Sequence, residues 1–558
     1  MKKLFTLLFA SLMAMGATAA EPEYSFNWAA SIEGTVAQAD NVIGVKQAAD
    51  GNYFAAMVWG GTTASGKTVS WGGHNLQDAA GADIEGADYT TGTSYVPNLL
   101  FAKIDKATGN PLWTVYSNFG YAADGNSALV PTEDGGAIAL VTFRQSQGAA
   151  PRLAAIVGAD GTVTHLQHTD ADKWAYRSVL VKIDADGKVM WTRTINALDE
   201  TSDGADATTP FYTYDVAVAA DGRIYVAGRM CTTVYFQGRA GRIVAKDAAC
   251  NEGWTGSSQT ACGNAFVAAF DKDGYVTDVI TPAADGCQYT QAARMVIDGT
   301  TLSVDGTMKK AAEGALVQPT LTTIDMTDNT VKAYREYGVE ATTGGKQNFN
   351  VYSLTLIGGS LYMTGNLAGS LTDGNVTLAA TGTAAQLDGY IARMDTDGNL
   401  LAARNYGTLN TGIMGVAEVN GGLVALAYQM TGAGAVALAY DKALTSELSR
   451  VTLMTAGTTA TAAAPLFDGE NLVVLSRGAK AASAFYGTTD VKPALTRSFG
   501  VLFGSWKVSG GIGTGISAVK ALEDGDHYIY NVNGMRMTSA ESVEKGIYIS
   551  NGRKVVVK

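Results

Sequence analysis

The sequence predicts an all-β fold built from a repeated antiparallel unit. Two phrases recur along the chain, and their clearest copies are VLVKIDADGKVMWTRT at residues 179–194 and DVAVAADGRIYVAG at 215–228. Apolar and polar residues alternate inside both phrases, which is the side-chain period of a β-strand. The Asp-Gly pairs supply the positive-φ turn of a tight hairpin, and Gly accounts for 66 of the 558 residues. A unit that recurs along a chain indicates a repeat architecture.

The chain begins with the features of a signal peptide. Lys2 and Lys3 precede an apolar stretch at 4–15, and the small residues at 17–20 provide a cleavage site. No later run reaches the roughly 18 apolar residues that are needed to cross a bilayer. We therefore expect residues 1–20 to be removed and the protein to be exported without a transmembrane segment. It would be secreted or held at the cell surface, with the periplasm as the alternative.

The number of copies predicts seven units between residues 21 and 508. Six copies lie at 98–143, 178–230, 264–307, 316–366, 389–429 and 435–478, and the one at 316–366 is degenerate because Asp328-Asn329 replaces Asp-Gly. Residues 28–60 resemble a copy without its first strand, and 498–508 resembles an isolated first strand. If these two pieces form one blade, no end unit needs an exposed face. The sequence therefore predicts a seven-bladed β-propeller closed by strands from opposite ends of the chain. A glycine-rich linker at 509–517 and a short β element at 518–558 follow it.

Variable segments separate the copies, and five of them are long. They lie at 61–97, 144–177, 231–263, 366–388 and 477–497. We expect each one where a blade's last strand leads to the next blade, as extra hairpins or long loops at one rim. Insertions confined to one face often mark the binding face of a repeat protein.

All four cysteines fall in one region, and in an exported chain they predict disulfides. They are Cys231, Cys250, Cys262 and Cys287. Their spacing lacks the close pairs that are typical of zinc sites. Three pairings are possible, and we favour Cys250–Cys262, which closes a short loop, with Cys231–Cys287 around it. Four buried free thiols are the alternative.

Charge and histidine content limit the chemistry. The net charge is −12 and no Lys/Arg cluster exists, so nucleic acid is excluded as a partner. The histidines are His74, His165, His168 and His527. His165 and His168 could be half of a metal site, but on a strand this spacing puts the rings on opposite faces, and no third ligand is identifiable. A solvated hairpin is the simpler interpretation, and no serine triad can be assembled.

Three phrases of the form Asp-x-Asp-Gly, at 184–187, 271–274 and 395–398, resemble the start of a calcium loop. They lack the late Glu ligand of such a loop, and hydrophobic strand residues follow almost at once. Asp and Gly are also the residues that a tight turn needs. We interpret the phrases as turns, and the sequence predicts neither a metal nor an organic cofactor.

The hairpin phrases resemble the Asp-x-x-Gly-x-x-x-Trp repeats of secreted bacterial β-propellers, called SBBP repeats, and the related pyrroloquinoline-quinone-type repeats. The resemblance covers about residues 28–508 and implies the fold, but those families include enzymes, scaffolds and binding proteins, so it implies no function. Residues 105–113 also resemble a quinone-enzyme docking motif. Enzymes of that class carry adjacent cysteines and a full set of Trp motifs, whereas here Trp28, Trp113 and Trp191 alone clearly fill the Trp position. We interpret these indoles as packing between blades.

The C-terminal residues 527–537 and 545–558 read as two hairpins, each turned by Asn-Gly. They resemble the end of type IX secretion sorting domains from Bacteroidetes, in which a Tyr-Asn-x-x-Gly phrase precedes Lys-Gly-Ile-Tyr and a basic finish. The matching residues are Tyr530, Asn531, Gly534, Lys545, Gly546, Tyr548 and Lys558. The resemblance implies that secretion machinery binds the tail, although the segment is shorter than a full sorting domain. A small β element strapped to the propeller is the alternative.

Two functions fit these observations. The first is an exported, monomeric, non-catalytic propeller that binds a protein or glycan. The second is a propeller-type hydrolase or lyase acting on polysaccharide or peptide, because such enzymes recruit carboxylates from distant blades. Converging carboxylates in the central mouth would favour the enzyme, and small residues there would favour the binding module. The 25 tyrosines, if grouped on one rim, would favour a glycan ligand in either case.

Overall fold

The computed structural model describes residues 21–35, 40–61, 68–86, 96–117, 127–144, 155–166, 176–195, 211–230, 234–245, 263–282, 287–310, 316–340, 348–379, 386–429, 434–455, 461–479, 484–488, 495, 499–512, 529–531, 536–537, 546–550 and 553–557. The predicted signal peptide at 1–20 lies outside this set. Every helix or strand element in the described part of the chain is a β-strand. No helix there is long and apolar enough to cross a membrane.

Seven sheets with four main strands each make up the body that the described residues form, and their main strands pair antiparallel. The first four sheets, each written from one edge inward to the other, are β2 (Asn41–Gln47), β3 (Tyr53–Gly61), β6 (Val96–Ile104), β7 (Pro111–Ser117); β8 (Ala128–Pro131), β9 (Ala137–Arg144), β12 (Tyr176–Ile183), β13 (Val189–Thr194); β14 (Phe211–Val218), β15 (Ile224–Met230), β18 (Asn264–Phe270), β19 (Val276–Ile280); and β20 (Cys287–Asp298), β21 (Thr301–Lys310), β22 (Val317–Asp325), β23 (Thr330–Glu336).

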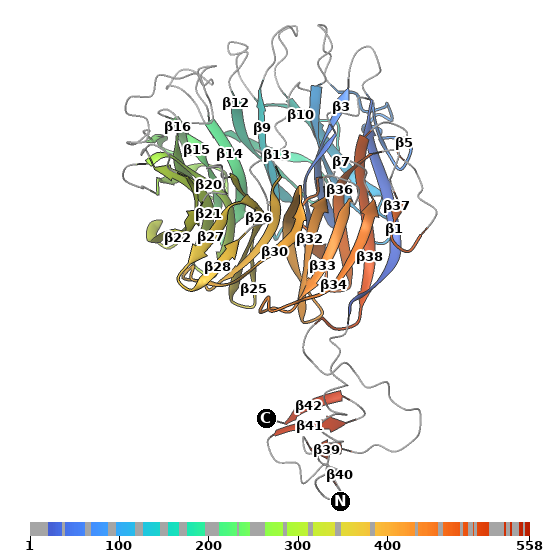
Figure 1. Cartoon of the computed structure of the whole chain (residues 1–558). Coiled ribbons are helices and arrows are strands. Elements are labelled where there is room, and N and C mark those ends of the chain that lie inside the picture. The colour runs from blue at the N-terminus through green and yellow to red at the C-terminus, as the bar shows by residue number, and fades with distance from the viewer. Residues whose placement is uncertain are drawn as a thin grey trace, which may run out of the picture.

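The other three sheets complete the body. They are β25 (Asn348–Ile357), β26 (Ser360–Ala368), β29 (Asp388–Met394), β30 (Leu400–Leu409); β31 (Thr411–Val419), β32 (Gly422–Gln429), β33 (Ala435–Tyr440), β34 (Glu447–Thr455); and β35 (Leu466–Phe467), β36 (Asn471–Ala479), β38 (Phe499–Ser509), β1 (Glu23–Gly34). The first-written strand of each sheet contacts that of the next, in the order β2, β8, β14, β20, β25, β31 and β35, and β35 also contacts β2. These seven are therefore the inner strands, and the fold is all-β and β-propeller-like, as the sequence predicts (Figure 1).

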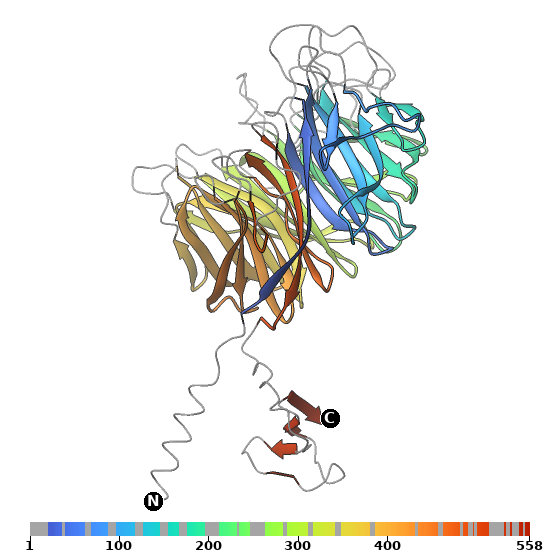
Figure 2. The same ribbon diagram turned by 90° about the vertical axis from the view of Figure 1, so that its right-hand side faces the viewer.

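Strands from the two ends of the described body lie side by side in the last sheet. β1 pairs antiparallel with β38, from Glu23 opposite Ser509 to Ile32 opposite Val501. The blue β1 and the orange-red β38 can be followed together in both views (Figure 1, Figure 2). Trp28 of β1 packs edge-on against Phe503 of β38, with ring centroids 5.0 Å apart. Hydrogen bonds and aromatic packing thus join residues that are far apart in sequence.

The structure corrects the predicted boundaries of the units. The copy at 98–143 spans β6, β7, β8 and β9, which belong to two different sheets. The segment at 28–60 is also divided, because β1 joins the last sheet while β2 and β3 start the first. The segment at 498–508 supplies a third strand, and the prediction of an isolated first strand is wrong. The repeat pattern has a period of four strands, and it does not say which of the four is the inner one.

The predicted position of the five insertions is also wrong. Each one joins the second strand of a sheet to the third strand of the same sheet, as β3 to β6 and β9 to β12 illustrate. Their described parts do form extra strands: β4 (Val69–Trp71), β5 (His74–Asn75), β10 (Ala155–Val157), β11 (Val163–His165), β16 (Val234–Gly238), β17 (Gly241–Ala245), β27 (Ser370–Asp373), β28 (Val376–Ala379) and β37 (Ala484–Phe485). β4, β10, β16 and β37 pair with the outer strands β1, β7, β19 and β34. They cover sheet edges that would otherwise be open to pairing with other chains.

In two of the sheets, a tryptophan indole N–H donates a hydrogen bond to the neighbouring sheet. Trp28 Nε1 of β1 donates to the carbonyl oxygen of Lys106 at 2.9 Å. Trp113 Nε1 of β7 donates to the carbonyl oxygen of Ala185 at 2.9 Å. Both acceptors lie directly after the Asp of a turn in the neighbouring sheet, Asp-x-x-x-Gly at 105–109 and Asp-x-x-Gly at 184–187. These contacts agree with the interpretation of the Trp positions as packing between blades.

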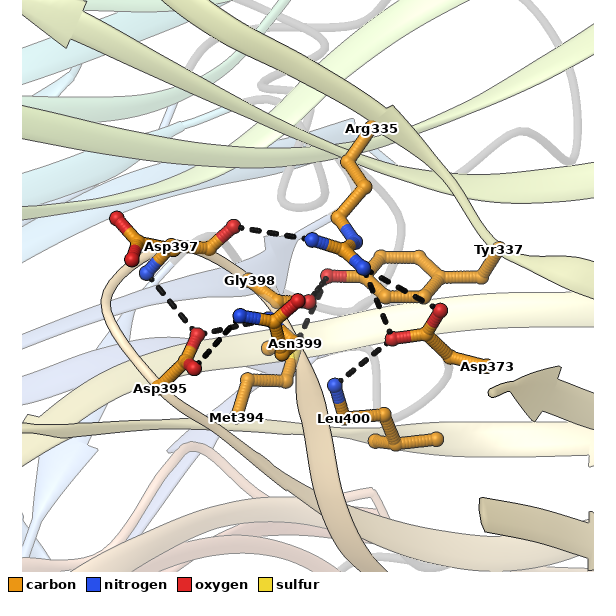
Figure 3. Close-up of polar contacts among 9 residues, drawn as sticks. All are labelled: Arg335, Tyr337, Asp373, Met394, Asp395, Asp397, Gly398, Asn399 and Leu400. Carbon is orange, nitrogen blue, oxygen red and sulfur yellow. Dashed lines mark hydrogen bonds and ion pairs between the residues drawn. The ribbon is translucent and has the colours of Figure 1, made fainter. Parts of the chain in front are cut away.

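A tyrosine replaces the indole where the repeat is degenerate. Tyr337 follows β23, and its hydroxyl donates to the carbonyl oxygen of Gly398 at 2.8 Å, in the turn before β30 (Figure 3). Arg335 lies beside it, 3.3 Å from the Asp373 carboxylate and 3.4 Å from the Asp397 carbonyl oxygen. Asp373 belongs to β27, which pairs with β28 and with β24 (Gly338–Glu340) in a separate three-stranded sheet. Polar contacts here substitute for the missing Trp.

The C-terminal element is a sheet of its own. β39 (Ile529–Asn531) pairs with β40 (Arg536–Met537), and β41 (Gly546–Ser550) pairs with β42 (Arg553–Val557). These are the two predicted hairpins, and β39 also pairs with β41 to join them. The linker prediction is wrong for residues 509–512, because Ser509 ends β38 and Ile512 is buried. The Ile512 N–H also donates to the carbonyl oxygen of Asn420 at 3.2 Å.

Candidate functional site

The candidate site is a cavity among the inner strands of the seven sheets. Its volume is about 390 Å³, near the lower end of the range of roughly 300–1,000 Å³ that small-molecule sites occupy. Its lining comes from β2, β8, β14, β20, β25, β31 and the segments beside them. The lining residues are Asn41, Val42, Ile43, Gly44, Val45, Lys46, Ser127, Ala128, Leu129, Asp215, Arg294, Met295, Tyr352, Ser353, Leu354, Met414, Thr461, Ala462, Ala463 and Ala464.

Five inner strands are irregular at this cavity. The pairing register shifts around Ile43 in β2, Tyr214 in β14, Arg294 in β20, Tyr352 in β25 and Met414 in β31. A β-bulge of this kind kinks the strand and turns a side chain away from its regular direction. Four of the five residues, all except Tyr214, line the cavity. The bulges therefore give the cavity its larger side chains.

Arg294 is held in the cavity wall by the backbone of both neighbouring sheets. Its Nη1 donates to the carbonyl oxygen of Tyr214 at 2.6 Å, and its Nε donates to that of Tyr352 at 3.1 Å. Its backbone N–H, which the bulge removes from the regular ladder, donates to Asp305 Oδ1 at 2.9 Å. These bonds fix the position of the guanidinium. They use two of its five N–H groups, and the other three do not donate to these carbonyls.

Asp215 is the carboxylate of the lining. Its Oδ1 accepts the N–H of Val216 and its Oδ2 accepts the N–H of Met295, both at 2.9 Å. Burial raises the pKa of Asp215, while the positive charges of Arg294 and Lys46 act in the opposite direction. Lys46 is exposed at the same cavity. The charged lining thus consists of one carboxylate and two cations.

Asp305 lies behind the lining, buried beside Arg294. Its Oδ2 has no hydrogen-bond partner among the residues that the structure describes. Burial raises the pKa of Asp305 to about 8, and the nearby Asp215 charge adds to the rise, while the Arg294 N–H and guanidinium oppose it. A buried carboxyl without a partner is less costly when it is neutral. Asp305 therefore supports the bulge as a largely protonated group at neutral pH.

The cavity does not bring a pair of acids together within its described lining. Asp215 is the one acid in that lining, and the rest is cationic, amide-bearing, aliphatic, aromatic, hydroxyl-bearing or small. Arg294, Tyr352 and Met414 come from β20, β25 and β31, while Ala462, Ala463 and Ala464 precede β35. Tyr352 packs against Tyr428 with ring centroids 6.4 Å apart. The lining therefore has Tyr352 and Arg294 on neighbouring inner strands, while the second cation, Lys46, comes from β2.

The Asp-x-Asp-Gly phrases are turns whose carboxylates accept backbone N–H groups. Asp395 Oδ1 accepts from Asp397 at 3.1 Å and from Asn399 at 2.8 Å (Figure 3). Burial raises the pKa of Asp395, but the hydrogen bonds from Asn399 and Asp397 outweigh it and the net pKa is lowered. Asp184 and Asp271 make the same pair of bonds in their own turns. The described residues contain no group of three His, Cys, Asp or Glu arranged to hold a metal ion.

The structure describes some of the other predicted residues. Cys287, at the start of β20, is disulfide-bonded. Cys231, Cys250 and Cys262 lie outside the described residues, so the pairing stays a prediction. His74 and His165 are exposed on β5 and β11, while His168 and His527 lie outside the described part. Of the tail residues, Tyr530 and Asn531 belong to β39 and Gly546 and Tyr548 to β41, while Gly534, Lys545 and Lys558 lie outside.

Comparison with known proteins assigns no family. No protein-family model matches the chain, and no curated protein matches it. Among solved structures, a mutant of Synechocystis apocarotenoid oxygenase is 11% identical, with 78% of this chain and 95% of that chain covered and a TM-score of 0.32. A neuraminidase-like protein of A/flat-faced bat/Peru is 12% identical, with 70% and 92% covered and a TM-score of 0.30. At such values these likenesses carry no argument about activity.

Proposed function

We propose that this chain is an exported, non-catalytic β-propeller of seven blades, closed by β1 and β38, that binds a protein or glycan through its central cavity. The contacts that run from β2 through the other inner strands and back to β2 support the ring. The long register between β1 and β38 supports its closure within one blade. Such closure leaves no end blade to be capped.

The observation that carries the binding function is the composition of the cavity wall. Glycoside hydrolysis uses two carboxyl groups that flank the bond to be cleaved. The described lining offers Asp215 alone, and both of its oxygens already accept backbone N–H groups. The same lining carries hydroxyl groups on Ser127, Ser353 and Thr461, but it contains no histidine that could act as their base. The wall is suited to contact and orientation of a ligand more than to proton transfer.

Export and surface location are part of the proposal, and they rest on the resemblance of the tail. In the tail sheet, β40 and β42 are the outer strands. Outer strands of a small sheet can pair with a receptor by strand addition. Deletion of 518–558, followed by fractionation of cells, tests this point. Retention of the deleted form in the periplasm is expected, and its arrival at the surface would make the tail structural.

Gly44 offers a direct test of the cavity. It lies in the wall, and a Cβ at this position would meet no atom within 4 Å. Gly44→Trp should therefore fill the cavity without a clash at the backbone, and Gly44→Ala is the matched control. Purified protein would be tested on arrayed glycans and candidate surface proteins, and for hydrolysis or elimination on polysaccharides and peptides. We expect binding that Gly44→Trp abolishes and Gly44→Ala keeps, with no turnover. Turnover that disappears in Gly44→Trp would establish the hydrolase or lyase alternative.

A further inference from the structure

Two cations in the cavity wall form no ion pair with the described residues. Lys46 and Arg294 both line the cavity, although the chain has a net charge of −12. Some cations elsewhere do form ion pairs, such as Lys103, 2.9 Å from Asp50, and Lys182, 2.7 Å from Asp134. The two cations outnumber Asp215, the one acid of the described lining, so this lining carries an excess of positive charge in an acidic protein. Such a region favours an anionic ligand, and its low-dielectric walls strengthen the attraction.

The same wall also presents hydrogen-bond acceptors. A carboxylate has about four acceptor positions. Asp215 uses two of them for the N–H groups of Val216 and Met295. Two positions are left for donors of a ligand. A simple carboxylate or inorganic anion has no donors to offer, whereas a sugar acid carries both a negative charge and several hydroxyl groups.

The third feature is the aromatic side of the wall. Tyr352 lines the cavity between Arg294 and Met414, and its position is fixed by packing against Tyr428. Rigid aromatic groups supply contact area at low entropic cost. The cavity volume of about 390 Å³ limits the occupant to a small group.

We propose that the cavity binds a carboxylated sugar of the uronic acid type, either free or as the end of a glycan. The sugar carboxylate would contact Lys46 and Arg294, its hydroxyl groups would donate to Asp215, and one face of the ring would lie against Tyr352. This inference rests on the proposed binding function and specifies the ligand class.

Calorimetric titration tests the proposal with three probes: D-glucuronate, D-glucose, which lacks the carboxylate, and acetate, which lacks the hydroxyl groups. We expect glucuronate to bind at least about tenfold more tightly than either, and its affinity to fall with added salt because the contact is partly exposed. Lys46→Met should weaken glucuronate binding on the order of tenfold, which is about 1.4 kcal/mol. Lys46 is exposed, so this change leaves the core intact. Lys272→Met, at an exposed turn outside the cavity, is the matched control and should have no effect.

Equal affinity for glucuronate and glucose, or an unchanged affinity in Lys46→Met, would overturn the inference. A disaccharide with a terminal glucuronate distinguishes a glycan end from a free sugar acid as the ligand. If the disaccharide binds more tightly than free glucuronate, the ligand is a glycan end. If it binds more weakly, the ligand is the free acid. A failure of this ligand class can be distinguished from a failure of the proposed binding function. If glucuronate does not bind but another glycan does, and Gly44→Trp abolishes that binding, the ligand class alone is wrong.

Discussion

Asp305 makes the stability of this protein dependent on pH in a direction that the structure specifies. Burial raises its pKa to about 8, whereas an unfolded Asp has a pKa of about 3.9. Between these values the folded state holds a proton that the unfolded state has released. The contribution of Asp305 to stability is therefore complete below about pH 4 and is lost as pH rises through about 8. In that window the free energy of unfolding falls by up to roughly 1.4 kcal/mol per pH unit for one such group.

Asp305→Asn removes this titration and keeps the shape of the side chain. The amide oxygen can still accept the Arg294 N–H that Oδ1 now accepts at 2.9 Å. The amide nitrogen replaces Oδ2, an atom that has no partner to lose. We expect the variant to be about as stable as the natural protein at pH 5. Its stability should fall less steeply with pH, by up to about 1.4 kcal/mol per unit between pH 5 and 7.5.

Asp40→Asn is the matched comparison. Burial raises the pKa of Asp40 to about 8 as well, but its two oxygens accept the N–H groups of Gly34 at 3.1 Å and Gly60 at 2.9 Å. An amide nitrogen cannot accept a hydrogen bond, so one buried N–H loses its partner. This change should also flatten the pH dependence, but it should cost about 1–3 kcal/mol at pH 5.

Urea unfolding followed by tryptophan fluorescence at pH 5, 6, 7 and 8 measures both effects. The two variants should share a flatter dependence on pH and differ in stability at pH 5. An Asp305→Asn protein with the same pH slope as the natural one would refute the reasoning, because it would mean that Asp305 is already ionised in the folded state.

Three further predictions concern the fold. Trp113→Phe removes the donor to the Ala185 carbonyl and should cost about 1–3 kcal/mol in urea unfolding, whereas Leu112→Ala, at a neighbouring side chain that is 52% exposed, should be nearly neutral. Deletion of 499–558 removes β38 and should abolish cooperative melting, while deletion of 521–558 should leave the melting temperature nearly unchanged; equal losses would contradict closure by β1 and β38. Non-reducing peptide mapping should find Cys250 linked to Cys262, a bond that contributes on the order of 2–3 kcal/mol, and free thiols at both positions would refute it.

Local chemistry was predictable from the sequence because the interactions that form it are local. The Asp395 turn is made by hydrogen bonds from Asp397 and Asn399, all within five residues. Alternating apolar residues likewise identify strands, and the tail hairpins follow from their Asn-Gly turns. The all-β class and the repeat were therefore visible without any knowledge of tertiary contacts.

The sheet boundaries were not predictable in the same way. The repeated pattern shows a period of four strands, but alternation and turn residues do not say which of the four is the inner one. Pairing of β1 with β38 decides that choice, and it is made by backbone groups that have no sequence signature. Tyr337 shows a related limit: its hydroxyl takes the role of an indole, and only the neighbouring Gly398 carbonyl reveals that role.

The candidate site depends wholly on tertiary structure. Lys46, Asp215 and Arg294 belong to three different sheets, and no local motif surrounds any of them. The bulge that places Arg294 in the wall is a small irregularity within a strand, which the period-two pattern does not reveal. Asp305 stabilises that bulge from the adjacent strand. Sequence determines which strands and turns this chain can form, whereas the arrangement of the inner strands decides which distant side chains share one cavity, because that proximity arises from packing between sheets.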